Sequence, residues 1–294
     1  MLRIAGRNPT SPRWGEVKNL VLRFNNAPSN RAPMRIATWN VNSIRQRIEH
    51  LTTWLKECEP DIVCLQEIKC TDDAFPRLEI EALGYNFVTH GQKTFNGVAL
   101  LSKLPFDETK SGLAGDDEDA HARFLEGVVT HKGGVLRIAC LYLPNGNPAD
   151  SDKYPYKLKW MSRLLDYSRE RLKAEEPLVL AGDFNVIPEE LDVYRPEEWA
   201  DDALFRPESR AAYRQMLGQG WTDAIRHLHP AASVYTFWEY TRGAWGRNAG
   251  LRIDHLLLNP AAAGRLDAAG VDRVVRGWEK TSDHAPAWVE LRDA

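Results

Sequence analysis

The chain has 294 residues, of which 43% are hydrophobic and 27% charged, and its formal net charge is −3. This composition is sufficient for a sizeable core and excludes a disordered or fibrous protein. Gly, Asp and His break the longest apolar stretches well short of membrane-spanning length. We therefore expect a soluble protein with no membrane partner.

The first 33 residues differ from the rest in charge. They hold six Lys/Arg and one Glu, a net +5, which leaves 32 basic and 40 acidic residues, or −8, for residues 34–294. DNA contact must then come from local Arg and Lys placement. Prolines and the lack of periodicity predict a basic, disordered extension, residues 1–33, before one catalytic domain, residues 34–294. We favour Met34 as the real start over an organellar targeting leader.

The cysteines indicate the compartment. None has paired CxxC spacing, and three of the four fall in or beside apolar segments, as buried reduced thiols do. They are Cys58, Cys64, Cys70 and Cys140. We expect a reducing, cytoplasmic location of the bacterial type.

The first half of the chain predicts strands, one helix and hairpins. Residues 34–41 alternate as a strand, and Ser43 is a plausible N-cap for a helix that runs to about Glu57 and stops before Pro60. Residues 61–66 predict a second buried strand. Four further strands are expected, the last two flanking a Gly133-Gly134 turn, over residues 85–90, 97–102, 124–131 and 135–142.

The second half predicts one long amphipathic helix and three more strands. The apolar face of this helix holds Leu158, Met161, Leu164, Leu165 and Leu172. Strands are expected over residues 178–181, 251–258 and 286–291. Residues 192–207, rich in acids and Pro, predict a surface insertion. Strands buried on both faces, mixed with hairpins and helices, favour an α/β fold: a four-layered α/β sandwich with two packed mixed β-sheets flanked by helices.

Several predicted strands end in short polar sequence motifs, called polar phrases below, whose side chains share one chemistry. The phrases are Trp39-Asn40-Val41-Asn42, Leu65-Gln66-Glu67, Gly182-Asp183-Phe184-Asn185, Arg252-Ile253-Asp254 and Ser282-Asp283-His284. Oxygen-rich groups that converge from several strand ends suit a hard divalent cation and a phosphate ester. A lone acid at a strand end is usually a solvated cap, so the prediction rests on the set.

Asp183 and Asn185 lie two residues apart on an extended segment, so their side chains project to one side. The carboxylate can take a proton from water, and the amide can donate to a phosphoryl oxygen. His284 could donate to another oxygen if a second carboxylate, for which Asp254 is the candidate, fixed its tautomer. The alternatives are an Asx-turn at Asp183 and a structural histidine at position 284. The histidines interpreted as structural or surface groups are His227, His229 and His255.

Together the phrases resemble the exonuclease III class of abasic-site endonucleases, in the endonuclease/exonuclease/phosphatase superfamily that shares the DNase I fold. The resemblance covers residues 34 to about 292. Its more selective phrases are His90-Gly91-Gln92-Lys93, Gly97-Val98-Ala99-Leu100-Leu101-Ser102, Tyr142-Leu143-Pro144-Asn145-Gly146, Gly250-Leu251-Arg252-Ile253-Asp254 and Ser282-Asp283-His284-Ala285-Pro286.

The resemblance implies a Mg²⁺-dependent DNA-repair phosphodiesterase, with Mn²⁺ as an expected substitute. It implies incision of duplex DNA 5′ to abasic sites, leaving a 3′-hydroxyl and a 5′-deoxyribose phosphate, with 3′-phosphatase and 3′-to-5′ exonuclease activity on blocked 3′ ends. Asp183 would activate water, and Asp254 would orient His284. The implied catalytic residues are Tyr142, Asp183, Asn185, Asp254 and His284. The implied metal shell is Asn40, Glu67, Asp183, Asn185, Asp283 and His284.

The resemblance also implies an apolar pocket for the extruded abasic sugar. Its matching positions are Phe237, Leu251 and Ile253, with Trp238 adjacent, and its size would reject an attached base. Lys93 and Asn145 are the other implied substrate-binding residues. The bacterial prototype has tryptophan where this chain has Phe237, and Asn145 replaces a glutamine. These differences leave open the balance of exonuclease to endonuclease activity.

Two other functions are consistent with part of the pattern. A superfamily enzyme that acts on inositol phosphates or phospholipids would share Glu67, Asp183, Asn185 and His284, but is not expected to carry the phrases at residues 90–93 and 250–252. A non-catalytic DNA-binding relative would have lost an acid or the Asp254 and His284 pair, and none is lost here. We expect a monomer.

Overall fold

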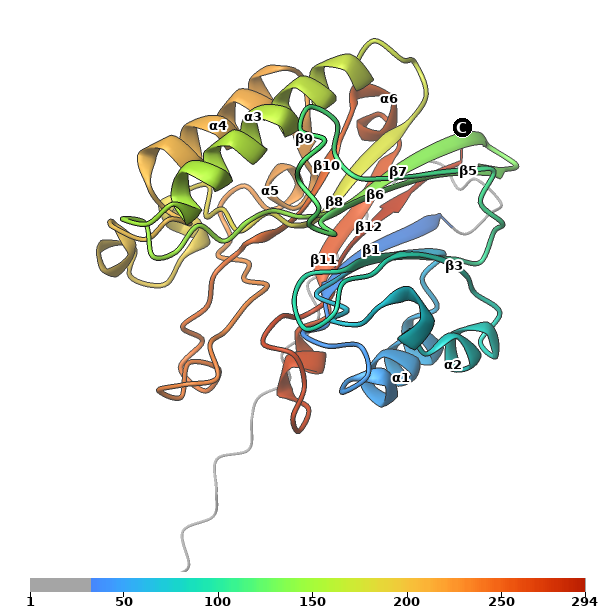
Figure 1. Ribbon diagram of the computed structural model, residues 1–294, viewed down its shortest axis with the longest axis horizontal. Coiled ribbons are helices and arrows are strands. Elements are labelled where there is room, and N and C mark those ends of the chain that lie inside the picture. The colour runs from blue at the N-terminus through green and yellow to red at the C-terminus, as the bar shows by residue number, and fades with distance from the viewer. Residues whose placement is uncertain (1–32, 294) are drawn as a thin grey trace, which may run out of the picture.

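The computed structural model describes residues 33–293, in which two six-stranded sheets pack face to face with helices on both outer sides (Figure 1). The predicted four-layered α/β sandwich is therefore confirmed. The predicted N-terminal extension lies outside the described residues, apart from Pro33. No described helix is long and apolar enough to cross a bilayer, and the four cysteines are free thiols.

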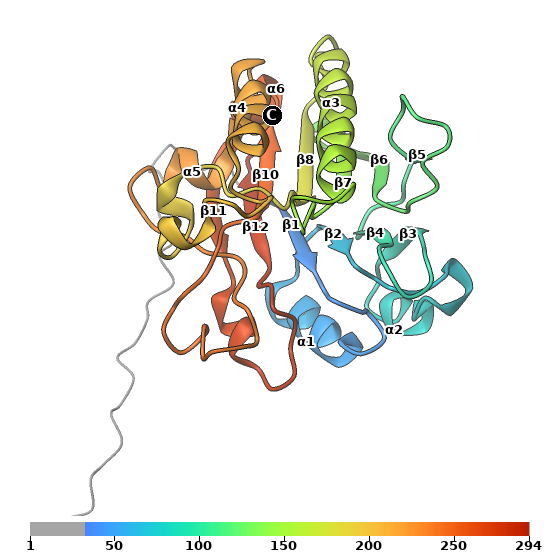
Figure 2. The ribbon, with the colours of Figure 1, turned by 60° about the vertical axis from the view of Figure 1, so that its left-hand side comes forward.

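The first sheet has the strand order β11-β12-β1-β2-β4-β3. β1 and β2 are parallel, and the other pairs are antiparallel. Helices α1 (Ile48–Cys58) and α2 (Arg77–Glu81) pack on its outer face (Figure 2). The strands are β1 (Met34–Asn40), β2 (Ile62–Gln66), β3 (Asn86–His90), β4 (Val98–Ser102), β11 (Leu266–Val271) and β12 (Ala287–Leu291).

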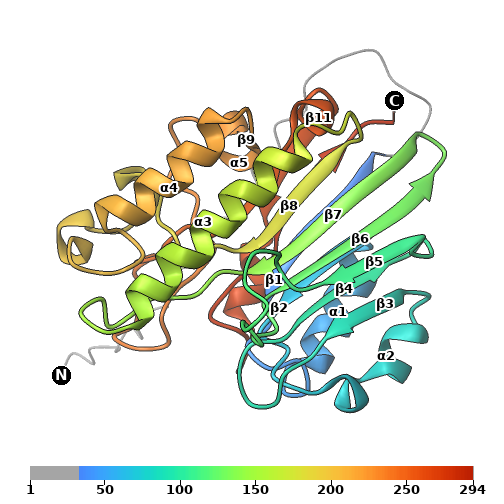
Figure 3. The same cartoon turned by 45° about the horizontal axis from the view of Figure 1, so that its top comes forward.

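The second sheet has the order β5-β6-β7-β8-β10-β9, with β7 and β8 parallel. Helices α3 (Lys153–Arg171) and α4 (Pro207–Gly218) lie along its outer face (Figure 3). Its strands are β5 (Glu108–Ser111), β6 (Phe124–His131), β7 (Gly134–Tyr142), β8 (Leu178–Asp183), β9 (Thr222–Asp223) and β10 (Asp254–Leu258). The short helices are α5 (Ala224–Leu228), α6 (Pro260–Ala263), η1 (Asp72–Ala74), η2 (Glu190–Asp192), η3 (Pro196–Trp199) and η4 (Arg273–Gly277).

Alternating side chains of the central strands build the layers. On β8, Val179 and Ala181 enter the core between the sheets, whereas Leu178 and Leu180 pack toward α3 and α4. Because side chains alternate along a strand, such a strand must be apolar on both faces. This is why the central strands are continuous hydrophobic runs that end abruptly in polar residues.

Two predictions about local structure were wrong. Ser43 is not the N-cap of α1, since its φ is 85° and the helix begins after Arg47. Residues 43–47 instead form turns that hydrogen bond back to the segment after β2. Residues 192–207 are not simply a surface insertion, because the Asp192 carboxylate is fully buried in an ion-pair network. Periodicity and composition do not reveal either tertiary contact.

Candidate active site

Strand register gathers the polar phrases at one end of the two sheets. In the second sheet Asp183, the last residue of β8, lies opposite Tyr142 of β7 and Asp254 of β10. In the first sheet Asn40 ends β1 beside the end of β2, so Glu67 follows at the same edge. The strand ends predicted from the sequence to converge therefore do so.

The segment before β12 ties this edge together. Ser282 Oγ donates to Asn40 O at 2.6 Å, and Trp39 Nε1 donates to His284 O at 3.1 Å. The Trp238 backbone N–H donates to Asp283 O at 2.9 Å. These bonds hold the two functional side chains of the segment, at positions 283 and 284, against both β1 and the loop that contains Trp238.

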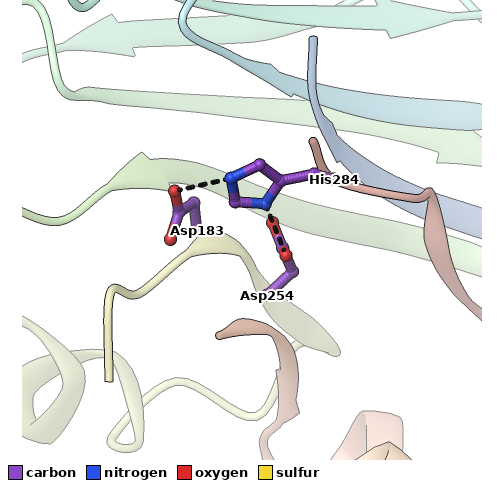
Figure 4. Close-up of side chains that lie close together, drawn as sticks. All are labelled: Asp183, Asp254 and His284. Atoms are coloured by element: carbon purple, nitrogen blue, oxygen red, sulfur yellow. Dashed lines mark hydrogen bonds and ion pairs between the residues drawn. The ribbon is translucent and has the colours of Figure 1, made fainter. Parts of the chain in front are cut away.

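Asp183, Asp254 and His284 form a buried group (Figure 4). His284 Nδ1 lies 2.8 Å from Asp254 Oδ2, and Nε2 lies 3.8 Å from Asp183 Oδ2. Burial disfavours the imidazolium, but the charges of Asp254 and Asp183 outweigh it and raise the pKa of His284. A protonated ring has two N–H donors, one held by Asp254 and one directed toward Asp183.

Asp183 is the residue best suited to accept a proton. Burial, helped by the nearby Asp254 charge, raises the pKa of Asp183 despite the opposing imidazolium. Its two oxygens accept hydrogen bonds from Asn40 Nδ2 at 3.0 Å and from the Asn185 backbone N–H at 2.9 Å. A carboxylate whose pKa is raised toward neutrality, in a fixed orientation, has the properties of a general base.

Glu67 has the opposite electrostatic environment. Burial acts to raise the pKa of Glu67, but the Lys69 ammonium at 2.6 Å and the Asn40 amide at 2.8 Å hold it below its usual value. Tyr142 also donates its hydroxyl to Glu67, at 2.9 Å. Burial and the neighbouring carboxylates raise the pKa of Tyr142, so its hydroxyl remains a donor. Glu67 is therefore an ionised acid beside a neutral phenol.

These groups open into a cavity of about 260 Å³. Its polar wall contains Glu67, Tyr142, Asn145, Asp183, Asn185, Asp283 and His284, all predicted from the sequence. Its apolar wall contains Phe237, Leu251 and Ile253, the predicted sugar pocket. The Phe237 ring packs edge-on against the His284 imidazole with centroids 4.9 Å apart. The apolar wall and the buried acid–histidine group thus meet directly.

Four predicted residues lie outside the cavity wall. Asn40 and Asp254 sit directly behind it, bonded to Glu67, Asp183 and His284 as described. Trp238 is fully buried, where it packs against Tyr235 and Trp245 and supports the loop. Lys93 is exposed on the loop after β3 and is not among the residues that line the cavity.

Lys157 is the most informative residue that sequence reasoning missed. It is fully buried on α3, and its ammonium donates to Asn145 O at 3.0 Å and to Asn185 O at 2.5 Å. Burial lowers the pKa of Lys157 to about 7, although Asp183 and Asp202 oppose this. The ammonium thus ties the loops after β7 and β8 together. Its spacing of four from Met161, on the apolar face, was the available signal.

Two other missed residues connect the acids. Asn42 Nδ2 donates to Asp283 Oδ1 at 3.2 Å, and Lys69 Nζ donates to Asn42 Oδ1 at 2.7 Å. Since Lys69 also pairs with Glu67, it links the acids of two strand ends through Asn42. Asn42 belongs to the first polar phrase, so the sequence offered a signal. Lys69 had none beyond its nearness to Glu67.

A second charged network lies behind the cavity. Fully buried Arg252 pairs with Asp192 and with Asp223, both at 2.7 Å, and Arg226 also pairs with Asp192. Burial opposes ionisation of Asp223, but Arg252 lowers the pKa of this acid to about 2. His255 also belongs to this network. Its Nδ1 lies 3.0 Å from Arg252 Nη1, and its Nε2 lies 2.9 Å from Val186 O. This histidine is structural, consistent with its interpretation from the sequence.

The donor set fits a hard divalent cation. Carboxylates of Glu67, Asp183 and Asp283 line one cavity, and the buried Asp254 Oδ1 has no hydrogen-bond partner among the described residues. Asp183, Asp254 and His284 can each present one ligand atom, all within 4.8 Å of one another. Carboxylate and amide oxygens are the ligands that Mg²⁺ and Mn²⁺ prefer. The excess of buried negative charge gives such an ion a favourable place to bind.

Comparisons with known proteins agree with this geometry. Residues 37–284 match the model of the endonuclease/exonuclease/phosphatase family. The chain is 34% identical to exodeoxyribonuclease III of Haemophilus influenzae, over 88% of this chain and 100% of that one.

Two solved structures are also similar. An AP endonuclease from Archaeoglobus fulgidus has a TM-score of 0.83, and a 3′ phosphatase from Neisseria bound to a product DNA hairpin has a TM-score of 0.84. Each is 36% identical, over 88% of this chain and 99% of the other. The chain therefore belongs to the endonuclease/exonuclease/phosphatase family and, within it, to the exonuclease III class.

Proposed function

We propose that this DNA-repair nuclease is a Mg²⁺-dependent phosphodiesterase that incises duplex DNA on the 5′ side of abasic sites. The products would be a 3′-hydroxyl and a 5′-deoxyribose phosphate, and the same site would remove 3′-phosphates and 3′-nucleotides. The observation that carries the proposal is the buried group of Asp183, Asp254 and His284, which opens into a cavity with one acidic and one apolar wall.

In this mechanism Asp183 takes a proton from the attacking water. Its orientation is fixed by Asn40 and by the Asn185 backbone, so one carboxylate face is kept toward the cavity. Its raised pKa brings its basicity close to that required near neutral pH. A positioned general base typically contributes about 10²- to 10⁴-fold to the rate.

Three hydrogen-bond donors would hold the scissile phosphate. Tyr142 would turn its hydroxyl, which stays protonated and here donates to Glu67, toward the phosphate, and His284 would offer the Nε2–H opposite its Asp254 partner. Asn185 uses one N–H of its amide on Leu143 O at 2.9 Å, so the second N–H is free for a phosphate oxygen. Donors preorganised in a buried site stabilise the charge that develops in the transition state.

A Mg²⁺ ion held by Asn40, Glu67 and Asp283, with Asp183, Asn185 and His284 nearby, would supply positive charge against the phosphate and the leaving 3′-oxygen. Family members depend on a divalent metal, and Mn²⁺ is the expected substitute in an oxygen-rich site. Lys69 keeps Glu67 ionised, so this acid does not need the ion to remain charged.

The apolar wall would hold the extruded abasic sugar. Phe237, Leu251 and Ile253 form it, and Trp238, the next residue after Phe237, packs against Trp245. Asn145, which donates to Asn185 Oδ1 at 3.0 Å, and the exposed Lys93 would contact the DNA strand beside the sugar. We also propose that the protein acts as a cytoplasmic monomer.

The test is nicking of a duplex with one tetrahydrofuran abasic analogue, in Mg²⁺ or in EDTA, by the wild-type protein and by Asp183→Asn. The proposal predicts metal-dependent incision on the 5′ side that the substitution abolishes. Absence of incision by well-folded protein would refute the abasic-endonuclease function. Phosphoinositide hydrolysis in the same buffer would then point to the alternative superfamily activity.

A further inference from the structure

A second cavity of about 220 Å³ adjoins the catalytic cavity. The two cavities share the wall residues Trp199, Asp202, Phe237, Glu239 and Leu251. We call the second cavity, lined beyond these by Tyr194, Glu198, Arg242, Arg247 and Ala249, the side chamber. Together the cavities reach the size of sites that hold small organic ligands, roughly 300–1,000 Å³. Phe237 and Leu251, two residues of the apolar wall, therefore border both cavities.

The floor of the side chamber is fixed before any ligand arrives. The Tyr194 N–H donates to Gly250 O at 3.0 Å, and the Ala249 N–H donates to Ala244 O at 2.9 Å. Gly250 is packed so closely that an added Cβ would lie 2.6 Å from Trp238 Nε1. Because both cavity walls depend on the same tight packing, their relative position is set by the fold.

The chemistry of the side chamber fits a neutral planar ring with polar edges. Tyr194, Trp199 and Phe237 supply aromatic side chains. The Arg242 and Arg247 guanidinium groups make no hydrogen bond or ion pair with any described residue, and acids lie in the same wall. Mixed charges with an acidic excess disfavour a second phosphate. Aromatic faces combined with hydrogen-bonding groups are the means by which proteins bind an extruded nucleobase.

We propose that the side chamber holds the base of an extruded or 3′-terminal nucleotide whose phosphate lies beside Asp183 and His284. The proposal rests on the proposed function and deepens it, because it assigns a separate binding place to the base of a nucleotide that the site removes. A sugar against Phe237 and Leu251 would have its C1′ substituent beside the wall that the catalytic cavity and the side chamber share. The base then contributes binding energy that an abasic sugar lacks.

The main test is a variant that fills the side chamber. Ala249 is half-buried in its wall and is not part of the catalytic cavity, so Ala249→Trp places a bulky ring in the proposed base position. Ala211→Trp, on the exposed face of α4, is the matched control. We compare kcat/KM for removal of a mispaired 3′-terminal nucleotide with kcat/KM for incision at tetrahydrofuran.

We expect Ala249→Trp to lower nucleotide removal at least tenfold more than tetrahydrofuran incision, and Ala211→Trp to change neither. Equal losses on both substrates, or no loss on either, would overturn the side-chamber proposal alone. If wild-type protein cleaves neither substrate in Mg²⁺, the proposed function fails and the side-chamber proposal falls with it. The two failures are thus distinguishable.

A second measurement does not depend on how Ala249→Trp folds. Free dAMP and 2-deoxyribose 5-phosphate are compared as inhibitors of tetrahydrofuran incision by wild-type protein and by Tyr194→Ala and Tyr194→Phe. We expect dAMP to inhibit at least fivefold more strongly, with this advantage lost in Tyr194→Ala and kept in Tyr194→Phe. Equal inhibition of the wild-type protein by both compounds would contradict a base site.

Discussion

Two buried charged clusters lie side by side around β10, and they have opposite electrostatics. Arg252 belongs to the network with Asp192 and Asp223, whereas Asp254, two residues later, belongs to the group with Asp183 and His284. In the first cluster guanidinium groups bond every acid, and the pKa values of its acids are lowered. In the second, burial and a neighbouring acid raise the pKa of Asp183.

The difference shows what each cluster is for. In the Arg252 network two guanidinium groups balance two acids, so the network fixes the strand and loop that carry Leu251 and Ile253. The Asp183 group holds more acid than base and leaves a buried Asp254 oxygen without a partner among the described residues. A charge excess that the fold does not neutralise is what a cation and a reacting phosphate can use.

We expect the largest change in stability from Arg252→Met. It leaves Asp192 and Asp223 buried without their main cation, so we expect the free energy of unfolding to fall by about 3–5 kcal/mol. Urea unfolding measures this, and Arg214→Met on the exposed face of α4 is the control. A stability loss no larger than that of the control would mean that the network does not hold this region together.

The Arg252 network also makes the free energy of unfolding depend on pH, through His255. Burial, together with Arg252, lowers the pKa of His255 to about 4. Because this folded pKa lies below the unfolded value of about 6.5, the unfolded chain binds more protons between these limits, and stability is lost as pH falls through that window. Across this window the free energy of unfolding falls by about 3 kcal/mol through His255.

Urea unfolding between pH 7 and pH 4 tests this contribution. His255→Gln should flatten the fall in stability over that window, because the glutamine side chain does not titrate there. His227→Gln, at an exposed histidine, should leave the slope as in wild type. An unchanged slope in His255→Gln would contradict the assignment.

In the catalytic cluster, Asp254→Asn removes the charge that holds His284. We expect incision to fall about 10- to 100-fold, as when a partner that orients a functional histidine is removed. DNA affinity, measured in EDTA, should stay near wild type because Asp254 lies behind the cavity wall. A variant that cuts at the wild-type rate would show that the ring needs no carboxylate partner.

The smallest expected effect concerns Lys157. Lys157→Met removes the ammonium that joins the loops bearing Asn145 and Asn185, so we expect kcat to fall about tenfold through misplacement of those loops. Lys159→Met, on the exposed side of the same helix, is the control. Equal kcat values for the two variants would make Lys157 a packing residue only.

The sequence predicted the layers and the polar strand ends because both depend on local patterns. Apolar runs identified β2, β4 and β8; Glu67 follows β2 and Asp183 ends β8, whereas Asp254 begins β10 and Asp283 precedes β12. It did not predict β5, whose residues are all exposed, or β11, whose Ala and Gly residues lack a strand signature. Both strands are fixed by pairing with neighbours rather than by their own residues.

The site was predictable where chemistry and local pattern coincide. Asp183 and His284 lie in the polar phrases of the sequence. By pattern alone, Lys157 is a solvated charge on a helix and Asp192 is one in an acidic loop. Their burial depends on partners distant in sequence: the loops after β7 and β8 for Lys157, and Arg252 for Asp192. Spacing within one element cannot show such contacts.

The most direct measurement compares Asp183→Asn with Asp192→Asn, recording incision at tetrahydrofuran in Mg²⁺ and the free energy of unfolding for both. We predict that Asp183→Asn loses about 10²- to 10⁴-fold in incision without losing stability, because a buried acid with a raised pKa is removed. Asp192→Asn should instead lose stability while its folded fraction still incises. Wild-type incision by Asp183→Asn would contradict the account.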